Sequence, residues 1–269
     1  MTEHERTAEI RAHWTEAARH ELDADGARPT ARDPNLQEAV EGAIERFLSR
    51  GQSLLDIGCG DGLSTLRFAR SVESALGLDY VDAFVSRART RAAADGIANA
   101  AFETGDVLSL GSVRARHGTF DVVTTIRCLI NLASSSDQAR AVGEIAALVK
   151  PGGLYLASEG WSEGMEGLNL ARRRAGLASI EVAKYNLLLS RADFEVEAAK
   201  HFDLVDYVGL GFFLFVSRVL QPLLVAPERP SHFHPLNKVG LEVEQRCLVG
   251  RQFDFCDYAG LYVFRRRAS

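Results

Sequence analysis

The sequence has few cysteines and no excess of positive charge, and both features argue against whole classes of protein. Four cysteines in 269 residues lie far apart, at positions 59, 128, 247 and 256. They lack the paired spacing of zinc ribbons or disulfide-rich secreted domains, so free thiols in a reducing compartment are predicted. The formal net charge of −5 argues against a nucleic-acid partner, because such partners are bound largely through their phosphates.

Neither a signal peptide nor a set of metal ligands is predicted from the sequence. The first twenty residues carry charges throughout, unlike a signal peptide, so we expect a cytoplasmic protein. His232 and His234 flank Phe233, but no third histidine or acid follows at metal-ligand spacing, so no metal site is predicted. The two histidines are assigned either to a surface loop or to the substrate pocket, where a histidine exchanges a proton near neutral pH.

One apolar run, Val208 to Ala226, has the length of a membrane span. Arg218, Gln221 and Pro222 interrupt it, and a charge at mid-span is costly, so no stable membrane insertion is expected. We predict that the run forms a buried helix, which lines either the active site or a dimer interface. The protein is expected to be a monomer or a homodimer. A role at a membrane surface or in a lipid pocket stays open. Arg218 is expected to face the substrate or a carboxylate. The apolar side chains of the run should pack against the sheet edge or a second subunit: Phe212, Phe213, Phe215, Val219, Leu220, Leu223 and Leu224.

A strand, a glycine turn and a helix follow one another in the stretch around which the chain is organised. Leu54–Ile57 predicts a buried strand, Gly58–Gly62 carries glycine at alternate positions, and a helix begins at Leu63. This geometry brings the backbone close to a nucleotide-like ligand. A dinucleotide fingerprint would need glycine where Leu63 stands, and no P-loop lysine follows. The carboxylate of Asp56, inside the strand, suits a cationic ligand better than a pyrophosphate.

The stretch Leu54–Gly62 resembles the first motif of the class I S-adenosylmethionine-dependent methyltransferases. Further features follow in the family's order: Asp79-Tyr80 after a second strand, Gly105-Asp106-Val107 after a third, a fourth strand Phe120–Ile126, and a turn Leu148–Gly153 into a fifth. The resemblance covers roughly residues 36–160. It implies S-adenosylmethionine as cofactor and S-adenosylhomocysteine as product.

Strands and helices alternate from residue 53 to 160, which predicts a parallel α/β sheet covered on both faces. The resemblance implies a seven-stranded Rossmann-like sheet whose last strand, Tyr258–Phe264, pairs antiparallel at or near an edge. Residues 1–50 are expected to form an N-terminal helical lid. Residues 51–269 are expected to form the methyltransferase core, with substrate-pocket insertions after strands five and six at about 160–191 and 209–252.

Ligands of such sheets bind at the carboxyl ends of the strands. The resemblance implies that Asp79 accepts the ribose hydroxyls and that Asp106 contacts the adenine. Trp14 is either an aromatic of the lid or ordinary core packing, and Arg127 points either into the pocket or into a salt bridge. The predicted cofactor-binding residues are Trp14, Asp56, Gly58, Cys59, Gly60, Asp79, Tyr80, Asp106, Val107 and Arg127.

The predicted function is methyl transfer from S-adenosylmethionine to a small molecule, such as a natural-product or saccharide intermediate. The sulfonium methyl is already activated, so positioning meets much of the chemical demand. Glu159, Tyr185 and His232 are the candidates for a general base or an orienting group. Nucleic-acid methyltransferases and aminopropyl transferases are disfavoured, because their motifs after strand four are missing. A lipid-like or macromolecular acceptor and a non-catalytic cofactor-binding protein remain alternatives. Oxygen, nitrogen and carbon acceptors are not distinguished.

Overall fold

A computed structural model of the chain describes residues 2–20, 28–247 and 250–268. Within these residues, seven strands form one sheet in the order β3-β2-β1-β4-β5-β7-β6. Strand β7 runs antiparallel to β5 and β6, and the other pairings are parallel. The strands are β1 (Ser53–Ile57), β2 (Ser74–Asp79), β3 (Ala100–Thr104), β4 (Phe120–Ile126), β5 (Val149–Ser158), β6 (Phe202–Val208) and β7 (Leu261–Arg266).

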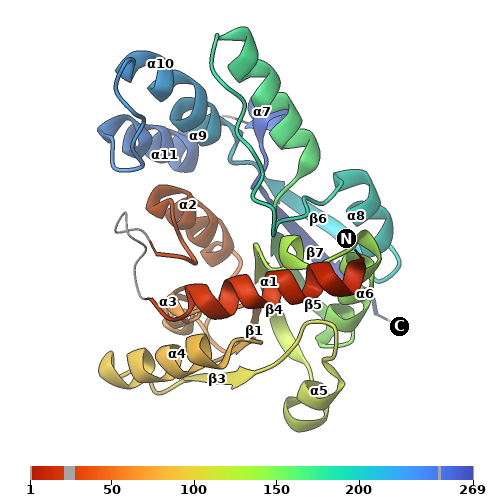
Figure 1. Cartoon of the computed structure of the whole chain (residues 1–269). Helices are drawn as coiled ribbons and strands as arrows, with labels where there is room; N and C mark the ends of the chain where they lie inside the picture. Colours follow the sequence, from red (N-terminus) through yellow and green to blue (C-terminus); the bar gives the residue numbers. More distant parts are fainter. Residues whose placement is uncertain (1, 21–27, 248–249, 269) are drawn as a thin grey trace.

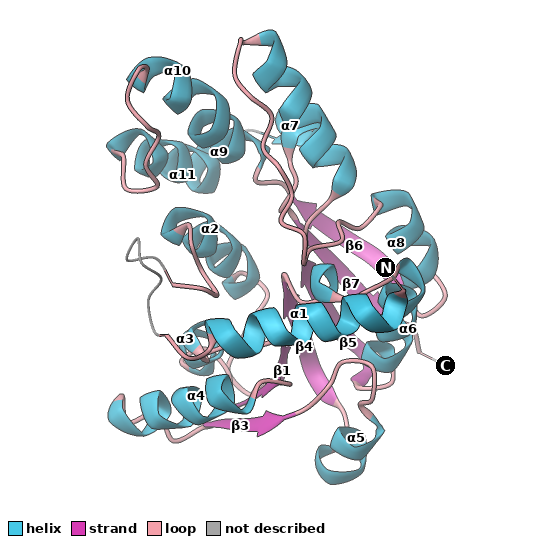
Figure 2. Cartoon of the chain, viewed as in Figure 1, coloured by secondary structure: helices cyan, strands magenta, loops and turns pink. Residues whose placement is uncertain are grey.

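Helices cover both faces of this sheet and form a separate group beside α2 (Figures 1 and 2). The α-helices are α1 (Glu3–Ala17), α2 (Pro34–Glu45), α3 (Leu63–Ala69), α4 (Asp82–Ala94), α5 (Gly111–His117), α6 (Ser135–Ala146), α7 (Ser162–Arg174), α8 (Arg191–Ala198), α9 (Gly211–Phe215), α10 (Gln221–Val225) and α11 (Pro235–Cys247). The described residues also form two 3₁₀ turns, η1 (Leu129–Asn131) and η3 (Gly250–Cys256), and one π-helical turn, η2 (Val216–Leu220).

The alternation of side chains along each strand divides the core in two. On β1, Leu55 and Ile57 point to the face covered by α5, α6 and α8, and Leu54 points to the face covered by α2, α3 and α9. Both faces of a parallel sheet are buried, so its strands are apolar on both sides. The polar Asp56 in β1 is therefore an exception that needs partners.

The order of the strands reverses direction between β1 and β4. From β1 the chain moves outward through β2 and β3, and it returns through β4 to build the other half. A crevice opens at such a switch point, beyond the carboxyl ends of the strands. The seven-stranded α/β fold expected from the sequence is confirmed. The last strand begins three residues later than expected, at Leu261, because the chain bends at Tyr258 and Ala259, where Ser158 Oγ donates to the Ala259 carbonyl (2.8 Å).

The apolar run Val208–Ala226 folds into the end of β6 and the consecutive turns α9, η2 and α10. Phe213, Leu214 and Val219 are buried, as expected for a helix inside a protein. Leu220, Leu223 and Leu224 are exposed, so they do not pack against the sheet edge. Their packing against a second subunit stays a prediction. None of the described helices is both long and apolar enough to cross a membrane.

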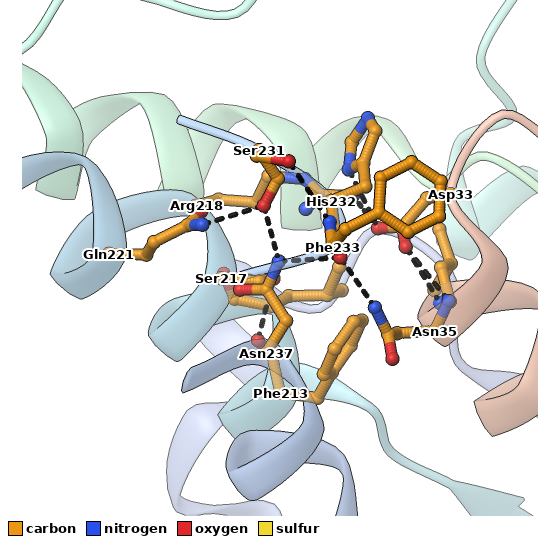
Figure 3. Close-up of polar contacts among 12 residues, drawn as sticks. Asp33, Asn35, Phe213, Ser217, Arg218, Gln221, Ser231, His232, Phe233 and Asn237 are labelled. Carbon is orange, nitrogen blue, oxygen red and sulfur yellow. Dashed lines mark hydrogen bonds and ion pairs between the residues drawn. The ribbon is translucent and has the colours of Figure 1, made fainter. Parts of the chain in front are cut away.

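Arg218 fastens this helical segment to the N-terminus of α2 (Figure 3). Its guanidinium pairs with the buried carboxylate of Asp33, which also accepts the backbone N–H of Asn35 and Leu36 as the N-cap of α2. The sequence-based expectation that Arg218 faces a carboxylate is thus confirmed. Although burial opposes ionisation, Arg218 and His232 hold the pKa of Asp33 well below its usual range.

Arg218→Met should lower the free energy of unfolding by about 3–5 kcal/mol, because it leaves the buried Asp33 carboxylate without its cation. Arg229→Met, on an exposed loop, should change it by less than about 0.5 kcal/mol. Urea unfolding at pH 7 measures both. Since the pKa of Asp33 is lowered on folding, the contribution of the pair is present above pH 3.8 and lost as the pH falls. Equal stability of both variants would contradict a structural role for the pair.

Candidate active site

Two adjoining cavities lie at the switch point. The larger, of about 410 Å³, extends from the glycine turn after β1 to α2 and α3, and the smaller, of about 60 Å³, lies between the ends of β2 and β3 and helix α1. Gly58, Asp79, Tyr80, Cys128 and Asn131 line both. All ten predicted cofactor-binding residues line one or both cavities.

The glycine turn is held against the end of β2. The backbone N–H groups of Gly58 and Cys59 both donate to the Leu78 carbonyl (2.7 and 2.9 Å), and the N–H of Gly60 donates to Asp79 Oδ2 (2.9 Å). Gly58 has a left-handed φ of 77°, and a Cβ there would lie 2.8 Å from the Cys128 side chain. Glycine is therefore required by both the conformation and the space. The turn presents backbone, not side chains, to the cavity.

Asp79 and Tyr80 provide polar groups at the point where the two cavities meet. Each Asp79 oxygen accepts one backbone N–H, from Gly60 and Val81, which leaves further lone pairs for a ligand. Burial raises the pKa of Asp79 to about 6. The hydroxyl of Tyr80 is buried and has no hydrogen-bond partner among the described residues. A buried polar group without a partner is costly, so this hydroxyl is positioned to bond a polar ligand.

Asp56 lies in the wall of the larger cavity, inside β1. Its carboxylate accepts hydrogen bonds from the hydroxyls of Thr65 (2.5 Å) and Thr124 (2.9 Å), on α3 and β4. Burial raises its pKa to about 6 despite these two donors. The residue thus ties three elements together beneath the glycine turn, and it is largely satisfied without a ligand.

Helix α1 closes the smaller cavity. Arg11 pairs with the carboxylate of Asp106 and lies over the Tyr80 ring, 4.8 Å from its centroid. Trp14 Nε1 donates to Asn131 Oδ1 (3.0 Å), and the same indole packs near Phe84. Trp14 therefore lines a cavity and belongs to a small apolar cluster at once. Figure 1 shows α1 passing in front of the strand ends.

Sequence reasoning missed a polar cluster around Asp61, to which the N-terminal segment and α4 both contribute. Arg28 (3.3 Å), Thr30 (3.3 Å) and Arg91 (3.0 Å) all bond the side chain of Asp61, the acid between the second and third glycines. Arg28 and Thr30 line the larger cavity, but they belong to no motif that could have marked them in the sequence. Asn131 was also missed, although its place just after β4 is a signal in a fold of this type.

Glu159, one of the three candidate catalytic residues, is wholly buried at the end of β5. Its two carboxylate oxygens accept the backbone N–H groups of Cys128 (3.2 Å) and Ile130 (3.3 Å). The residue holds the turn after β4, whose Cys128 lines both cavities, but does not itself line either.

Tyr185 and His232 also lie outside the cavity walls, in different parts of the molecule. Tyr185 stacks on His13 of α1, with ring centroids 3.8 Å apart, and meets Trp14 edge-on. His232 is exposed, and its Nδ1 lies 3.4 Å from Asp33 Oδ2 (Figure 3). The fold does not bring the three candidates together. No three metal-ligating side chains converge anywhere in the described ranges.

The buried Glu159 should give the protein a specific pH dependence of stability. Burial raises its pKa from 4.5 to about 7. The folded state therefore binds an extra proton between these values, and the free energy of unfolding falls by about 3 kcal/mol as the pH rises through this window. Urea unfolding of Glu159→Gln from pH 4 to 8 should show a decrease that is smaller by this amount, because the raised pKa values of Asp56 and Asp79 still contribute. Glu242→Gln, exposed on α11, should keep the whole decrease. An unchanged slope in Glu159→Gln would refute the assignment.

Comparison with known proteins identifies the central part of the chain. Residues 54–153 match a family model described as a methyltransferase domain. The ubiquinone biosynthesis O-methyltransferases of Acinetobacter baylyi and Acinetobacter baumannii (strain AYE) are each 33% identical over 103 residues. That match covers 38% of this chain and 41% of each relative. The chain thus spans about two fifths of the length of the curated relatives it matches.

Solved structures share the fold over most of the chain. The N-methyltransferase NodS of Bradyrhizobium japonicum, in complex with S-adenosylhomocysteine, is 13% identical with a TM-score of 0.55, covering 95% of this chain and 98% of its own. The magnesium protoporphyrin IX methyltransferase of Synechocystis, also with S-adenosylhomocysteine bound, is 15% identical with a TM-score of 0.54 over 88% and 83%. The [4+2]-cyclase SpnF is 20% identical with a TM-score of 0.54 over 92% and 85%. At these identities the likeness concerns the fold.

The family match, the strand order and the cavity at the switch point agree with one another. The chain therefore contains a class I methyltransferase domain, whose cofactor is S-adenosylmethionine.

Proposed function

We propose that the whole chain is an enzyme that transfers a methyl group from S-adenosylmethionine to a small-molecule acceptor. The observation that carries the proposal is the continuity of the larger cavity, which runs from the predicted cofactor residues to the wall made by α2. Its volume of about 410 Å³ is in the range of small-molecule sites. An acceptor held there would lie next to the cofactor.

The residues around the cavities fit the cofactor. We propose that Asp79 accepts the ribose hydroxyls with its free lone pairs and that the partnerless Tyr80 hydroxyl bonds a polar atom of the ligand. The backbone of Gly58–Gly60 can approach closely because a Cβ is absent at both ends of this segment. Asp106 is proposed to contact the adenine once Arg11 moves aside. When bound, the cofactor supplies an activated methyl group on a sulfonium centre.

The chain's own contribution to the reaction is proposed to be positioning and exclusion of water. Helix α1, with Trp14 and Arg11, covers the site as a lid, and residues 1–50 act as that lid segment. Glu159 is proposed to orient the turn after β4, and Tyr185 to orient the lid through its stack on His13. His232 is proposed to act indirectly, through Asp33 and the start of α2. These are the orienting roles that methyl transfer needs, since the methyl group is already activated.

A lipid-like acceptor is a second candidate, favoured by one feature of the 209–252 segment. Leu224 (72% exposed) and Phe233 (76% exposed) stand in solvent at either end of a proline-rich loop. Apolar side chains in such a position suit contact with a lipid or a membrane surface.

Calorimetry with S-adenosylhomocysteine tests the cofactor site, and micromolar binding is expected for the wild-type chain. Asp79→Asn should weaken binding by about 1–3 kcal/mol, because a charged acceptor is lost while an oxygen remains for the backbone. Gly60→Val should abolish binding, since a Cβ at this left-handed residue would lie 2.9 Å from Thr30. Asp95→Asn, exposed after α4, is the control. Full affinity in both site variants would refute this pocket.

The acceptor class is tested by offering labelled S-adenosylmethionine with panels of small phenols, amines, sugars and long-chain quinols. We expect turnover of a small molecule and loss of that turnover in Asp79→Asn. Exclusive turnover of long-chain acceptors, abolished by Phe233→Ser together with Leu224→Ser, would favour the lipid alternative. Cofactor binding without turnover of any member would point to the non-catalytic alternative.

A further inference from the structure

Arg127, the first residue after β4, has an unusual backbone conformation. Its φ of 52° is the only positive value for a non-glycine residue within the described ranges. A side chain in this region is disfavoured by contacts of its Cβ, so the surrounding structure must hold it. The Arg127 N–H donates to the Ser158 carbonyl (2.8 Å), and its carbonyl accepts from Asn131 Nδ2 (2.7 Å). The fold thus fixes the backbone of Arg127, which lies in the wall of the larger cavity.

Arg127 differs from the other arginines of that wall, which form ion pairs. Arg28 pairs with Asp61, and Arg67 pairs with Glu38 and Glu41. Asp56 and Asp79 are held by two hydrogen bonds each, from threonine hydroxyls and from backbone N–H groups respectively. The half-buried guanidinium of Arg127, by contrast, has no hydrogen bond, ion pair or ring contact with any described residue.

A free guanidinium in a partly enclosed cavity attracts an anion, and the cofactor strengthens this preference. The sulfonium centre is itself positive, so an additional unmatched cation in the same cavity is unfavourable. An anionic group placed beside Arg127 would neutralise it and would accept two parallel N–H bonds if it were a carboxylate. Arg127 lines the larger cavity. It does not line the smaller cavity, whose walls include Asp106 and Val107. The larger cavity is the one with room for an acceptor.

We propose that the methyl acceptor carries a carboxylate and that Arg127 binds it. This inference rests on the proposed function, and it narrows the acceptor to small carboxylic acids. Arg127 is then a specificity-determining residue that anchors one end of the acceptor, while the glycine turn and the lid hold the cofactor. A carboxylate also occurs on the amino-acid part of the cofactor, so the test must separate these two sources.

The experiment compares the full-length wild-type chain with Arg127→Gln, Arg127→Lys and the control Arg114→Gln, an exposed arginine on α5. Calorimetry gives the Kd of S-adenosylhomocysteine, and then that of benzoate for the chain saturated with S-adenosylhomocysteine. In parallel, phenols and amines are offered with labelled S-adenosylmethionine as matched pairs, each as the carboxylic acid and as the primary amide.

We expect saturable benzoate binding to the wild type and at least tenfold weaker binding to Arg127→Gln, with partial retention in Arg127→Lys. Acids should exceed their amides at least tenfold in kcat/KM in the wild type and lose that advantage in Arg127→Gln. The Kd of S-adenosylhomocysteine should change less than threefold in all variants. A tenfold loss of S-adenosylhomocysteine affinity in Arg127→Gln would assign the guanidinium to the cofactor's carboxylate and overturn the proposal.

Two further outcomes would also overturn it, namely no benzoate binding to the loaded wild type, or amides used as well as acids. A wild-type chain that fails to bind S-adenosylhomocysteine at all would instead remove the proposed function on which the inference rests.

Discussion

The hydrogen bonds that fasten the glycine turn to the end of β2 are the constraint on which the site depends. Two backbone N–H groups of the turn share the Leu78 carbonyl, and a third bonds the carboxylate of Asp79. One side chain thus closes the turn and still faces the cavity. The helix that follows can begin close to the sheet because a Cβ at Gly62 would lie only 2.6 Å from Ala88. The same contacts that build the fold shape the larger cavity.

The remaining walls of the cavities come from parts of the chain far from that turn. Helix α1 is attached through Arg11 to Asp106 and through Trp14 to Asn131. Helix α2 is held at its N-terminus by Asp33 and Arg218, which belong to segments 185 positions apart. A buried ion pair is costly to form and more costly to break, so it favours one arrangement of the segments it joins. The Arg218–Asp33 pair therefore joins the segment 211–225 to the start of α2, whose residues line the larger cavity.

The places of the three acid-base candidates fit the proposed mechanism, in which the chain positions the reactants and does not supply a strong base. None of the three acid-base candidates lines a cavity, and Glu159 spends both oxygens on the backbone of the turn after β4. An activated methyl group needs a nucleophile in line with the breaking bond more than it needs a strong base. One fold can carry many different activities, so the residues in the walls of the cavity, and not the sheet, decide the reaction.

The sequence by itself determined the sheet, the glycine turn and the acids at the strand ends. These features depend on neighbouring residues: apolar runs at strand length, glycines where φ is positive, and acids directly after Leu78 and Gly105.

Only the tertiary structure decided which side chains meet across the chain. The positions of Thr30 beside Gly60, of Arg218 beside Asp33 and of Tyr185 on His13 depend on how distant segments pack. Glu159 likewise stands at a strand end, as the other acids do. However, it is buried and its carboxylate accepts two backbone N–H groups, so it does not line either cavity. Local patterns carry no information about burial of that kind, because it arises from contacts that form only when the chain is folded.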